Sequence, residues 1–199
     1  MALRPEAIHD LTSQVLGCVC AALVDASAQI PGQPGCPCRA CVIPGLAAWD
    51  SCEDPCGTPA GQDSGQLTVS VARIYSATLE SFPAEARTVF GVKGCTPPPF
   101  TAVELVITLL RCAPTPNDDG CPPSCEDLEA AARRLHVDMV TVYNALLCCL
   151  PGTDPVRPRG RRFLLGQQKV LGPEGGCVGL EQRATVALAG CGCPEEVAP

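Results

Sequence analysis

Cysteine makes up 16 of the 199 residues, and this density constrains the chain more than any other feature of its sequence. Small secreted domains reach such densities because they bury too little apolar surface to fold without crosslinks. A chain of this length buries roughly two-thirds of its unfolded surface and does not depend on them. Arg4, Glu6 and Asp10 interrupt the first ten residues, so we expect no signal peptide and synthesis in a cytosol. Cysteine content favours oxidation, whereas the missing signal favours a reducing compartment.

Five of the cysteines gather in a Pro- and Gly-rich loop excursion over residues 31–66; they are Cys36, Cys38, Cys41, Cys52 and Cys56. Disulfides are the favoured interpretation, because crosslinks restrict the unfolded chain most usefully where a loop has little core of its own. A zinc site, which needs about four ligands, and buried free thiols are the alternatives. The histidines, His9 and His136, fall on predicted helices away from this loop.

The other cysteines are expected to pack locally or to form local disulfide bridges. A bridge between Cys121 and Cys125 would hold the entry to a helix, whereas the adjacent Cys148 and Cys149 are poorly placed to bond each other, so one of them faces the core. Cys38 and Cys41 have the C-x2-C spacing of redox enzymes, but no helix signal follows them.

Hydrophobic periodicity predicts an α+β domain over residues 1–190 with a C-terminal tail over 191–199. Helical spacing marks 5–28 and 125–149, the second helix being preceded by the Ser124–Asp127 capping pattern. Alternation predicts strands at 67–75 and 102–112, a short strand near 39–43, and a terminal hairpin of 163–171 with 178–188. The segment 102–112 is apolar on both faces, which predicts a central strand covered on both sides. We therefore expect a mainly antiparallel sheet of four to five strands flanked by two long helices.

Charge and motifs argue against several function classes. The net charge of −7 disfavours general nucleic-acid binding, and the apolar stretches at 15–24 and 137–150 are short or interrupted for a membrane span. No catalytic, cofactor-binding or metal-binding residue set is predicted, and the protein is not expected to be an enzyme. Four arginines between Arg157 and Arg162 read as a solvated loop or as a contact for an acidic partner.

The order of elements and several segments resemble the tail terminator proteins of long-tailed bacteriophages. The similar segments are 65–75 (GQLTVSVARIY), 102–112, 125–149 and 175–188. The sequences of these segments and of 31–41 (PGQPGCPCRAC) also resemble those of virion structural proteins of phages that infect actinobacteria. The excursion from Cys36 to Cys56 departs from the tail terminator plan, so no role for it is carried over.

The resemblance implies a structural virion protein, assembled in the host cytoplasm and located in the tail or neck. Such a protein forms a ring, of six copies in this family, that ends the tail tube and joins it to the head–tail connector or stopper proteins, with DNA passing transiently through. Catalytic residues, cofactors and metals are not part of the expectation. Another neck component, such as a head-completion or stopper protein, is the nearest alternative. A secreted cysteine-rich binding module and a zinc or thiol enzyme are alternatives from other classes.

Overall fold

The computed structural model describes residues 6–47, 65–78, 80–86, 100–116, 120–150, 162–174 and 176–189. Within these residues, two helices and five strands follow one another. Their order is α1 (Ala7–Gln29), β1 (Arg39–Val42), β2 (Gln66–Ala77), β3 (Phe100–Cys112), α2 (Cys125–Cys149), β4 (Phe163–Glu174) and β5 (Cys177–Ala189). The predicted elements are all present, with ends within about three residues of those expected. The tail over 191–199 and the basic residues 157–161 lie outside the described residues.

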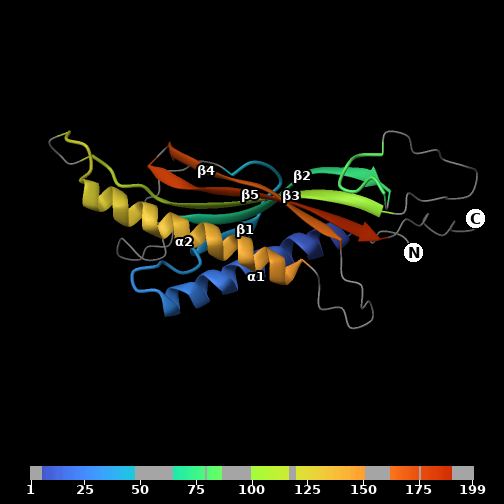
Figure 1. The fold of residues 1–199 in the computed structure, drawn as a ribbon, viewed down its shortest axis with the longest axis horizontal. Helices are drawn as coiled ribbons and strands as arrows, with labels where there is room; N and C mark the ends of the chain where they lie inside the picture. Colours follow the sequence, from blue (N-terminus) through green and yellow to red (C-terminus); the bar gives the residue numbers. More distant parts are fainter. Residues whose placement is uncertain are drawn as a thin grey trace, which may run out of the picture.

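The fold is α+β, with a five-stranded mixed sheet in the order β1-β2-β3-β5-β4 (Figure 1). Three of its four pairings are antiparallel, as predicted. β1 runs parallel to β2, an arrangement the alternation pattern did not predict, since periodicity carries no strand direction. The predicted terminal hairpin is formed by β4 and β5.

Both helices pack on the same face of the sheet, which corrects the prediction that helices flank it (Figure 1). We call this the helix face and the opposite side the open face. β3 is the central strand, as predicted, and every residue from Ala102 to Arg111 is buried. Within the described ranges, no helix covers the open face, so the burial of β3 on that side has another origin. The ion pairs described below cover β3 on that side around Glu104.

The α1 helix buries one stripe and exposes the rest of its surface. Leu11, Val15, Val19 and Leu23 recur at spacings of four and pack in the core with β2 and β3. By length and composition alone, this helix of 23 residues could also cross a membrane, because an 18-residue window of it has a mean hydropathy of 1.5 and 28% of that window is buried. This corrects the expectation that the apolar stretch was too short. The buried stripe shows α1 as a core helix of this domain.

The α2 helix begins where its sequence predicts, because Ser124 caps it. The hydroxyl of Ser124 accepts a hydrogen bond from the amide nitrogen of Asp127 at 3.1 Å, which satisfies one of the orphan donors of the first turn. Val142 and Leu146 then point into the core, and Leu150 closes it at the end of the helix.

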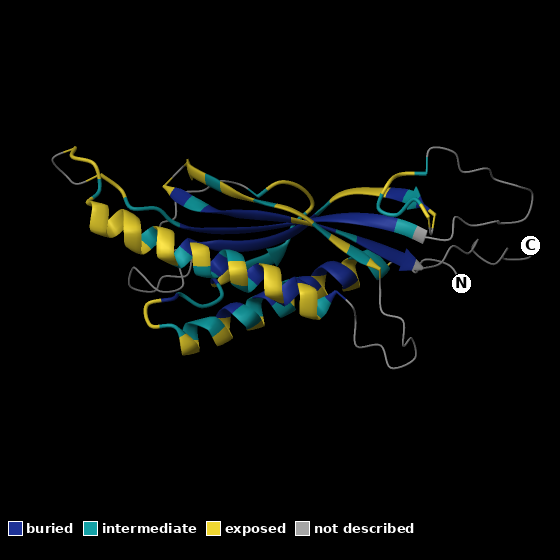
Figure 2. Ribbon diagram, viewed as in Figure 1, coloured by how far each residue is buried: buried dark blue, intermediate teal, exposed yellow. Residues whose placement is uncertain are grey.

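The main core lies between the helix face and the helices, and the middle of the sheet is its most buried part (Figure 2). On β3 it takes Val103, Leu105, Ile107 and Leu109. The open face has a much smaller apolar cluster at one end, formed by Tyr75, Ala77 and Ala102 with Phe82 against them. Apolar burial therefore stabilises chiefly one side of the sheet.

Candidate functional site

A row of alternating charges crosses the open face of the sheet. Nε of Arg73 on β2 donates to Oε2 of Glu104 on β3 at 2.6 Å, and Nη1 of Arg183 on β5 donates to Oε1 of Glu104 at 3.1 Å. Nε of Arg183 also donates to Glu181 at 3.1 Å, and Nζ of Lys169 on β4 lies 3.3 Å from the same carboxylate oxygen. We call these five residues the charge ladder. It joins four neighbouring strands through their side chains.

The ladder hides its carboxylates and exposes its cations. The side chains of Glu104 and Glu181 are 12% and 11% exposed, whereas those of their three cationic partners are about half exposed. Burial raises the pKa of Glu104, but the hydrogen bonds and charges of Arg73 and Arg183 outweigh burial and hold that pKa below its ordinary value. Glu104 therefore stays ionised, and the ladder closes the open face over β3.

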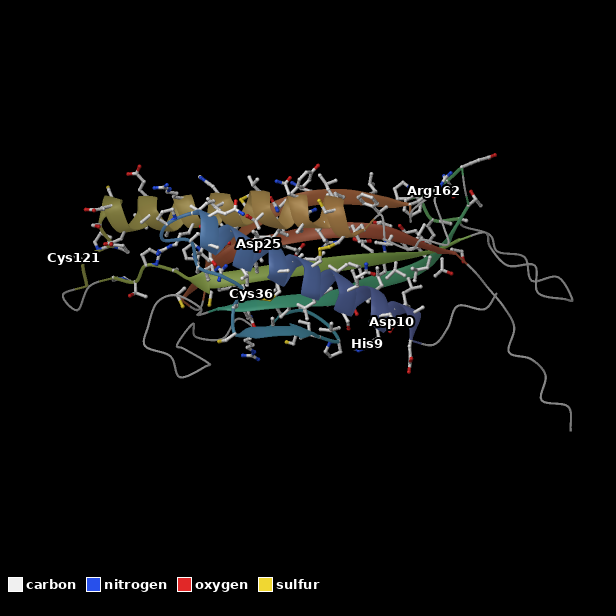
Figure 3. All side chains as sticks on the ribbon, turned by 90° about the horizontal axis from the view of Figure 1, so that it is seen from below. His9, Asp10, Asp25, Cys36, Cys121 and Arg162 are labelled. Atoms are coloured by element: carbon white, nitrogen blue, oxygen red, sulfur yellow. A yellow bond between two sulfur atoms is a disulfide. The ribbon has the colours of Figure 1, made fainter. Side chains whose placement is uncertain are left out.

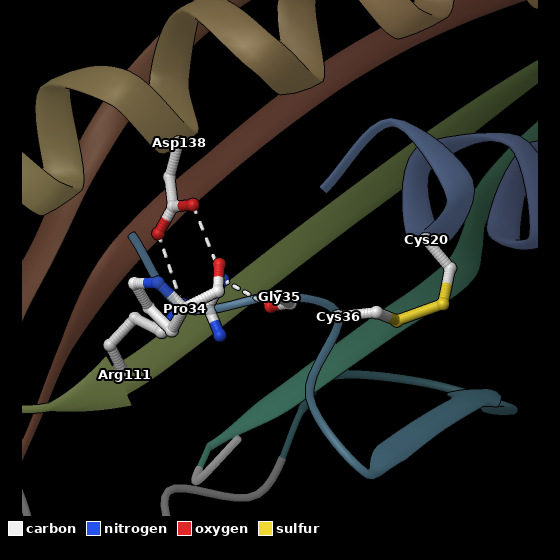
Figure 4. The surroundings of a disulfide bond; sticks show 6 residues. All are labelled: Cys20, Pro34, Gly35, Cys36, Arg111 and Asp138. Atoms are coloured by element: carbon white, nitrogen blue, oxygen red, sulfur yellow. Dashed lines mark hydrogen bonds and ion pairs between the residues drawn. A yellow bond between two sulfur atoms is a disulfide. The ribbon is translucent and has the colours of Figure 1, made fainter. Parts of the chain in front are cut away.

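A second charged cluster lies on the helix face, between β3, α2 and the turn after α1 (Figure 4). Nε of Arg111 donates to Oδ2 of Asp138 at 3.0 Å, and its Nη2 donates to Oδ1 at 3.2 Å. The same Nη2 donates to the carbonyl oxygen of Gly35 at 2.8 Å, and the amide of Gln33 donates to Asp138 at 2.7 Å. We call this the buried pair, with Gln33 and the carbonyl groups as its supports.

Desolvation dominates the electrostatics of the buried pair. Asp138 is fully buried and its pKa is raised by burial, which the hydrogen bonds and charge of Arg111 oppose without cancelling. Nη1 of Arg111 is buried and has no hydrogen-bond partner among the described residues. The pair holds the turn at 33–35 against β3 and α2, which positions the start of the predicted loop excursion.

Disulfides tie this same side of the molecule together. Cys18 of α1 bonds Cys149 of α2, and Cys20 of α1 bonds Cys36 in the turn beside the buried pair (Figure 4). Cys38 and Cys177 are disulfide-bonded as well. The preference for disulfides is thus supported within the described residues. The sequence did not predict that Cys36 reaches back to a helix.

Of the other cysteine predictions, one is confirmed and one is wrong. One of the adjacent pair faces inward, as predicted, since Cys149 is bonded and Cys148 is an exposed thiol. The predicted bridge between Cys121 and Cys125 is wrong, because both are free and exposed. Figure 3 shows Cys121 at the end of the molecule opposite Arg162. Cys125 is the first residue of α2, and its turn of helix projects beyond the core, so packing does not bring the two thiols together.

Metal and thiol chemistry has no assembled site in the described part of the chain. There, no three His, Cys, Asp or Glu side chains are placed to hold a metal ion. Cys36 and Cys38 are bonded and Cys41 is a half-buried thiol on β1, while Cys52 and Cys56 lie outside the described residues. His9 and His136 lie on α1 and α2, as predicted, and both are exposed.

A shallow groove of about 670 Å³ lies where the end of α1 approaches α2. Ile30, Ala132, Val137 and Val140 give it an apolar lining, and His136 lies beside them. An exposed apolar stripe continues along α2 through Val140, Tyr143 and Leu147. The groove brings no second titratable group into a catalytic arrangement with His136, because its other charged residues are Glu129 and Arg133 of the same helix.

Both edges of the sheet leave strand surface uncovered in the described part of the chain. β4 is the outermost strand on one side and exposes Leu164 and Val170, which are 47% and 52% accessible. On the other side, β1 pairs with β2 only as far as Val69, and the amide of Ala86 donates to the carbonyl oxygen of Ser76, so the stretch of β2 between these two contacts forms the edge there. Ile74 on that stretch is 51% exposed. An open strand edge is a template for pairing with another chain.

Neither charged cluster was predicted from the sequence, although the sequence contains a signal for both. Glu104 and Arg111 interrupt a strand predicted to be buried, and Asp138 interrupts the buried stripe of α2. Charged residues at buried positions need partners of opposite charge, so these positions predict that each side chain pairs with another charged residue of the chain. Gln33, in a turn, carried no such signal.

Comparison with known proteins finds no matching family model and no matching curated protein.

Proposed function

We propose that this chain is a structural virion protein that assembles into a homo-oligomeric ring at the end of a phage tail tube. The observation that supports this most directly is the open edge formed by β4, a strand of 12 residues with apolar side chains left exposed. Natural monomers protect such edges, because they invite pairing with another chain. A subunit that is always assembled has its edge covered by its neighbour.

A ring needs two different surfaces on each copy, since one self-complementary surface closes a dimer. The sheet supplies two, because its outer edges are β4 on one side and the uncovered part of β2 on the other. The order of elements, with one helix before the sheet, one between β3 and β4, and a terminal hairpin, is the order on which the tail terminator resemblance depends. The finer proposal is therefore a tail-terminator-like domain carrying a cysteine-rich loop insertion.

The disulfides fit a protein that changes compartment after assembly. A virion protein is made in a reducing cytosol and then released into an oxidising exterior, where disulfides persist. The bonds from α1 to Cys149 and Cys36 tie the helices and the first turn into one unit. They would reinforce an assembled part, which requires no catalytic role for the cysteines.

The proposed partners are other copies of the chain, the tail tube protein, and the connector or stopper proteins, with DNA passing transiently through the ring. The alternative role is another neck component, such as a head-completion or stopper protein. It differs from the tail terminator role in the partners and the position of the ring, and the same subunit structure would serve both. The cysteine-rich secreted module receives no separate support from an exposed ligand site in the described residues.

Imaging tests this proposal. The purified chain is expected to form closed rings with a central opening in negative-stain images, and labelled antibody is expected to mark the junction of head and tail on assembled particles. Label on another part of the neck would favour the alternative neck role. A monomer at every concentration in light scattering, together with unlabelled particles, would contradict both.

A further inference from the structure

Strand registers place Leu164 and Ile74, two exposed apolar residues of opposite sheet edges, one residue apart in height. Across the sheet, Leu164 on β4 pairs with Thr185 on β5, Thr185 pairs with Glu104 on β3, and Glu104 pairs with Arg73 on β2. Leu164 and Arg73 therefore lie at the same height. One residue along, Phe163 is level in the same way with Ile74 on β2, through Val186 and Val103.

We infer that the contact between neighbouring copies joins the first part of β4 of one copy to the uncovered part of β2 of the next. This contact rests on the ring proposed above. Rotation about an axis parallel to the strands keeps residues at their heights, so Phe163 of one copy would lie beside Ile74 of its neighbour. Leu164 would lie beside Arg73 of that neighbour, whose aliphatic stem suits an apolar contact.

Strand direction is compatible with this pairing. β4 is antiparallel to β5 and β5 is antiparallel to β3, so β4 runs in the same direction as β3. β2 is antiparallel to β3 and therefore to β4. Copies related by a cyclic rotation would thus pair β4 with β2 in antiparallel fashion, the arrangement that forms closely spaced backbone hydrogen bonds.

Charge at this height is complementary. The carbonyl oxygen of Arg162 accepts from the amide of Ala187, which is level with Tyr75 at the opposite edge. Beside Tyr75 lies the turn that carries Glu85, which is exposed and 4.0 Å from Arg73. Exposed Arg162 of one copy would approach Glu85 of its neighbour. A protein with a net charge of −7 otherwise repels its own copies, so such a contact also sets the register.

Further along β4 the match is lost, which supplies a control. Val170 is level with Leu180, Leu109 and Leu67, and Leu67 is covered on its outer side by Ala40 of β1. Val170 is as exposed as Leu164 on the same strand, yet at its height the other edge is already occupied. The contact should therefore depend on Leu164 and Ile74 and not on Val170.

The test compares Leu164→Lys, Ile74→Asp and Val170→Asp by sedimentation velocity over a range of concentrations. All three positions are about half exposed, so the variants are expected to fold, which far-UV circular dichroism checks. Leu164→Lys and Ile74→Asp should each weaken association by about 100-fold, because the lysine would face the like charge of Arg73 and the aspartate would be buried against Phe163 without a partner. Val170→Asp should assemble like the unchanged chain.

A mixture of the two impaired variants gives the sharpest readout. Leu164→Lys retains an intact β2 edge and Ile74→Asp retains an intact β4 edge, so together they should form a one-to-one dimer and nothing larger. A dimer of Ile74→Asp alone would overturn the contact in favour of a two-fold pairing of β4 with itself. A monomeric unchanged chain, unaffected assembly of Leu164→Lys, or loss of assembly in Val170→Asp would also overturn it. If the mixture dimerises while antibody leaves the particles unlabelled, the contact holds and the proposed function fails.

Discussion

The two faces of this sheet each hold a carboxylate paired with arginine, and the protein shifts their pKa values in opposite directions. Glu104 on the open face has a lowered pKa, and Asp138 on the helix face has a raised one. Burial raises the pKa in both cases. The difference lies in the degree of burial and the partners, since Glu104 bonds two arginines that remain about half exposed, whereas Asp138 bonds one arginine that is itself buried.

This difference shows how a charge can serve each face. On the open face, water still solvates the cations, so the ladder closes the surface of β3 at little cost in desolvation. On the helix face, both charged groups are removed from water, which costs desolvation free energy. The contribution of the pair is then the single arrangement of the chain that it specifies. That arrangement is the turn at 33–35, which it holds beside the Cys20–Cys36 disulfide.

The largest effect is expected from removing the bond between the helices. Replacing Cys18 and Cys149 by alanine frees a loop with a sequence separation of 131 residues. Chain entropy predicts a loss of about 5 kcal/mol in the free energy of unfolding, measured by urea denaturation under oxidising conditions. Cys148→Ala removes the adjacent exposed thiol and should change stability by less than about 0.5 kcal/mol. Equal effects of the two changes would show that the disulfide between the helices adds nothing to the stability of the fold.

Breaking the buried pair should cost nearly as much. Asp138→Ala leaves the guanidinium of Arg111 buried without a counter-charge, with an expected loss of about 3–5 kcal/mol in urea denaturation. Arg111→Met combined with Asp138→Leu removes both charges and should cost less than the single change. A double variant as unstable as the single one would show that the pair stabilises the fold by more than mutual compensation.

The charge ladder should tolerate its own disruption better. Glu104→Gln removes the carboxylate that two exposed arginines share, so we expect a loss of about 1 kcal/mol that shrinks as salt is added. Urea denaturation at low and high ionic strength measures both. A loss as large as that of Asp138→Ala would erase the contrast between the faces.

The smallest effect, and the most specific, concerns pH. Because the pKa of Asp138 is raised, its contribution to stability is full at low pH and declines as pH rises above its ordinary value of 3.8. Because the pKa of Glu104 is lowered, its contribution is full above its ordinary value of 4.5 and is lost as pH falls through the folded value. Asp138→Asn and Glu104→Gln should therefore flatten opposite slopes of the curve of stability against pH. Two variants that change the same slope would contradict the assignment.

Local pattern was sufficient to predict every helix and strand within the described residues. Ser124 announces its helix through a hydrogen bond to a residue three positions away, and the stripe from Leu11 to Leu23 repeats within a single helix. Such signals depend only on neighbours along the chain, and the backbone geometry that they satisfy is the same in any fold.

The pairing of distant residues was decided by the tertiary structure alone. Gln33 meets Asp138 across 105 positions, and Cys18 meets Cys149 across 131, so no short-range spacing could select these partners from the other charged residues and cysteines. The side of the sheet that the helices cover, and hence which edge segments are left open, follows from the packing of all seven elements together. The sequence by itself determined where each described helix and strand lies. Three-dimensional packing determined which charges, thiols and strand edges meet, because those contacts depend on distance in space and hardly at all on distance along the chain.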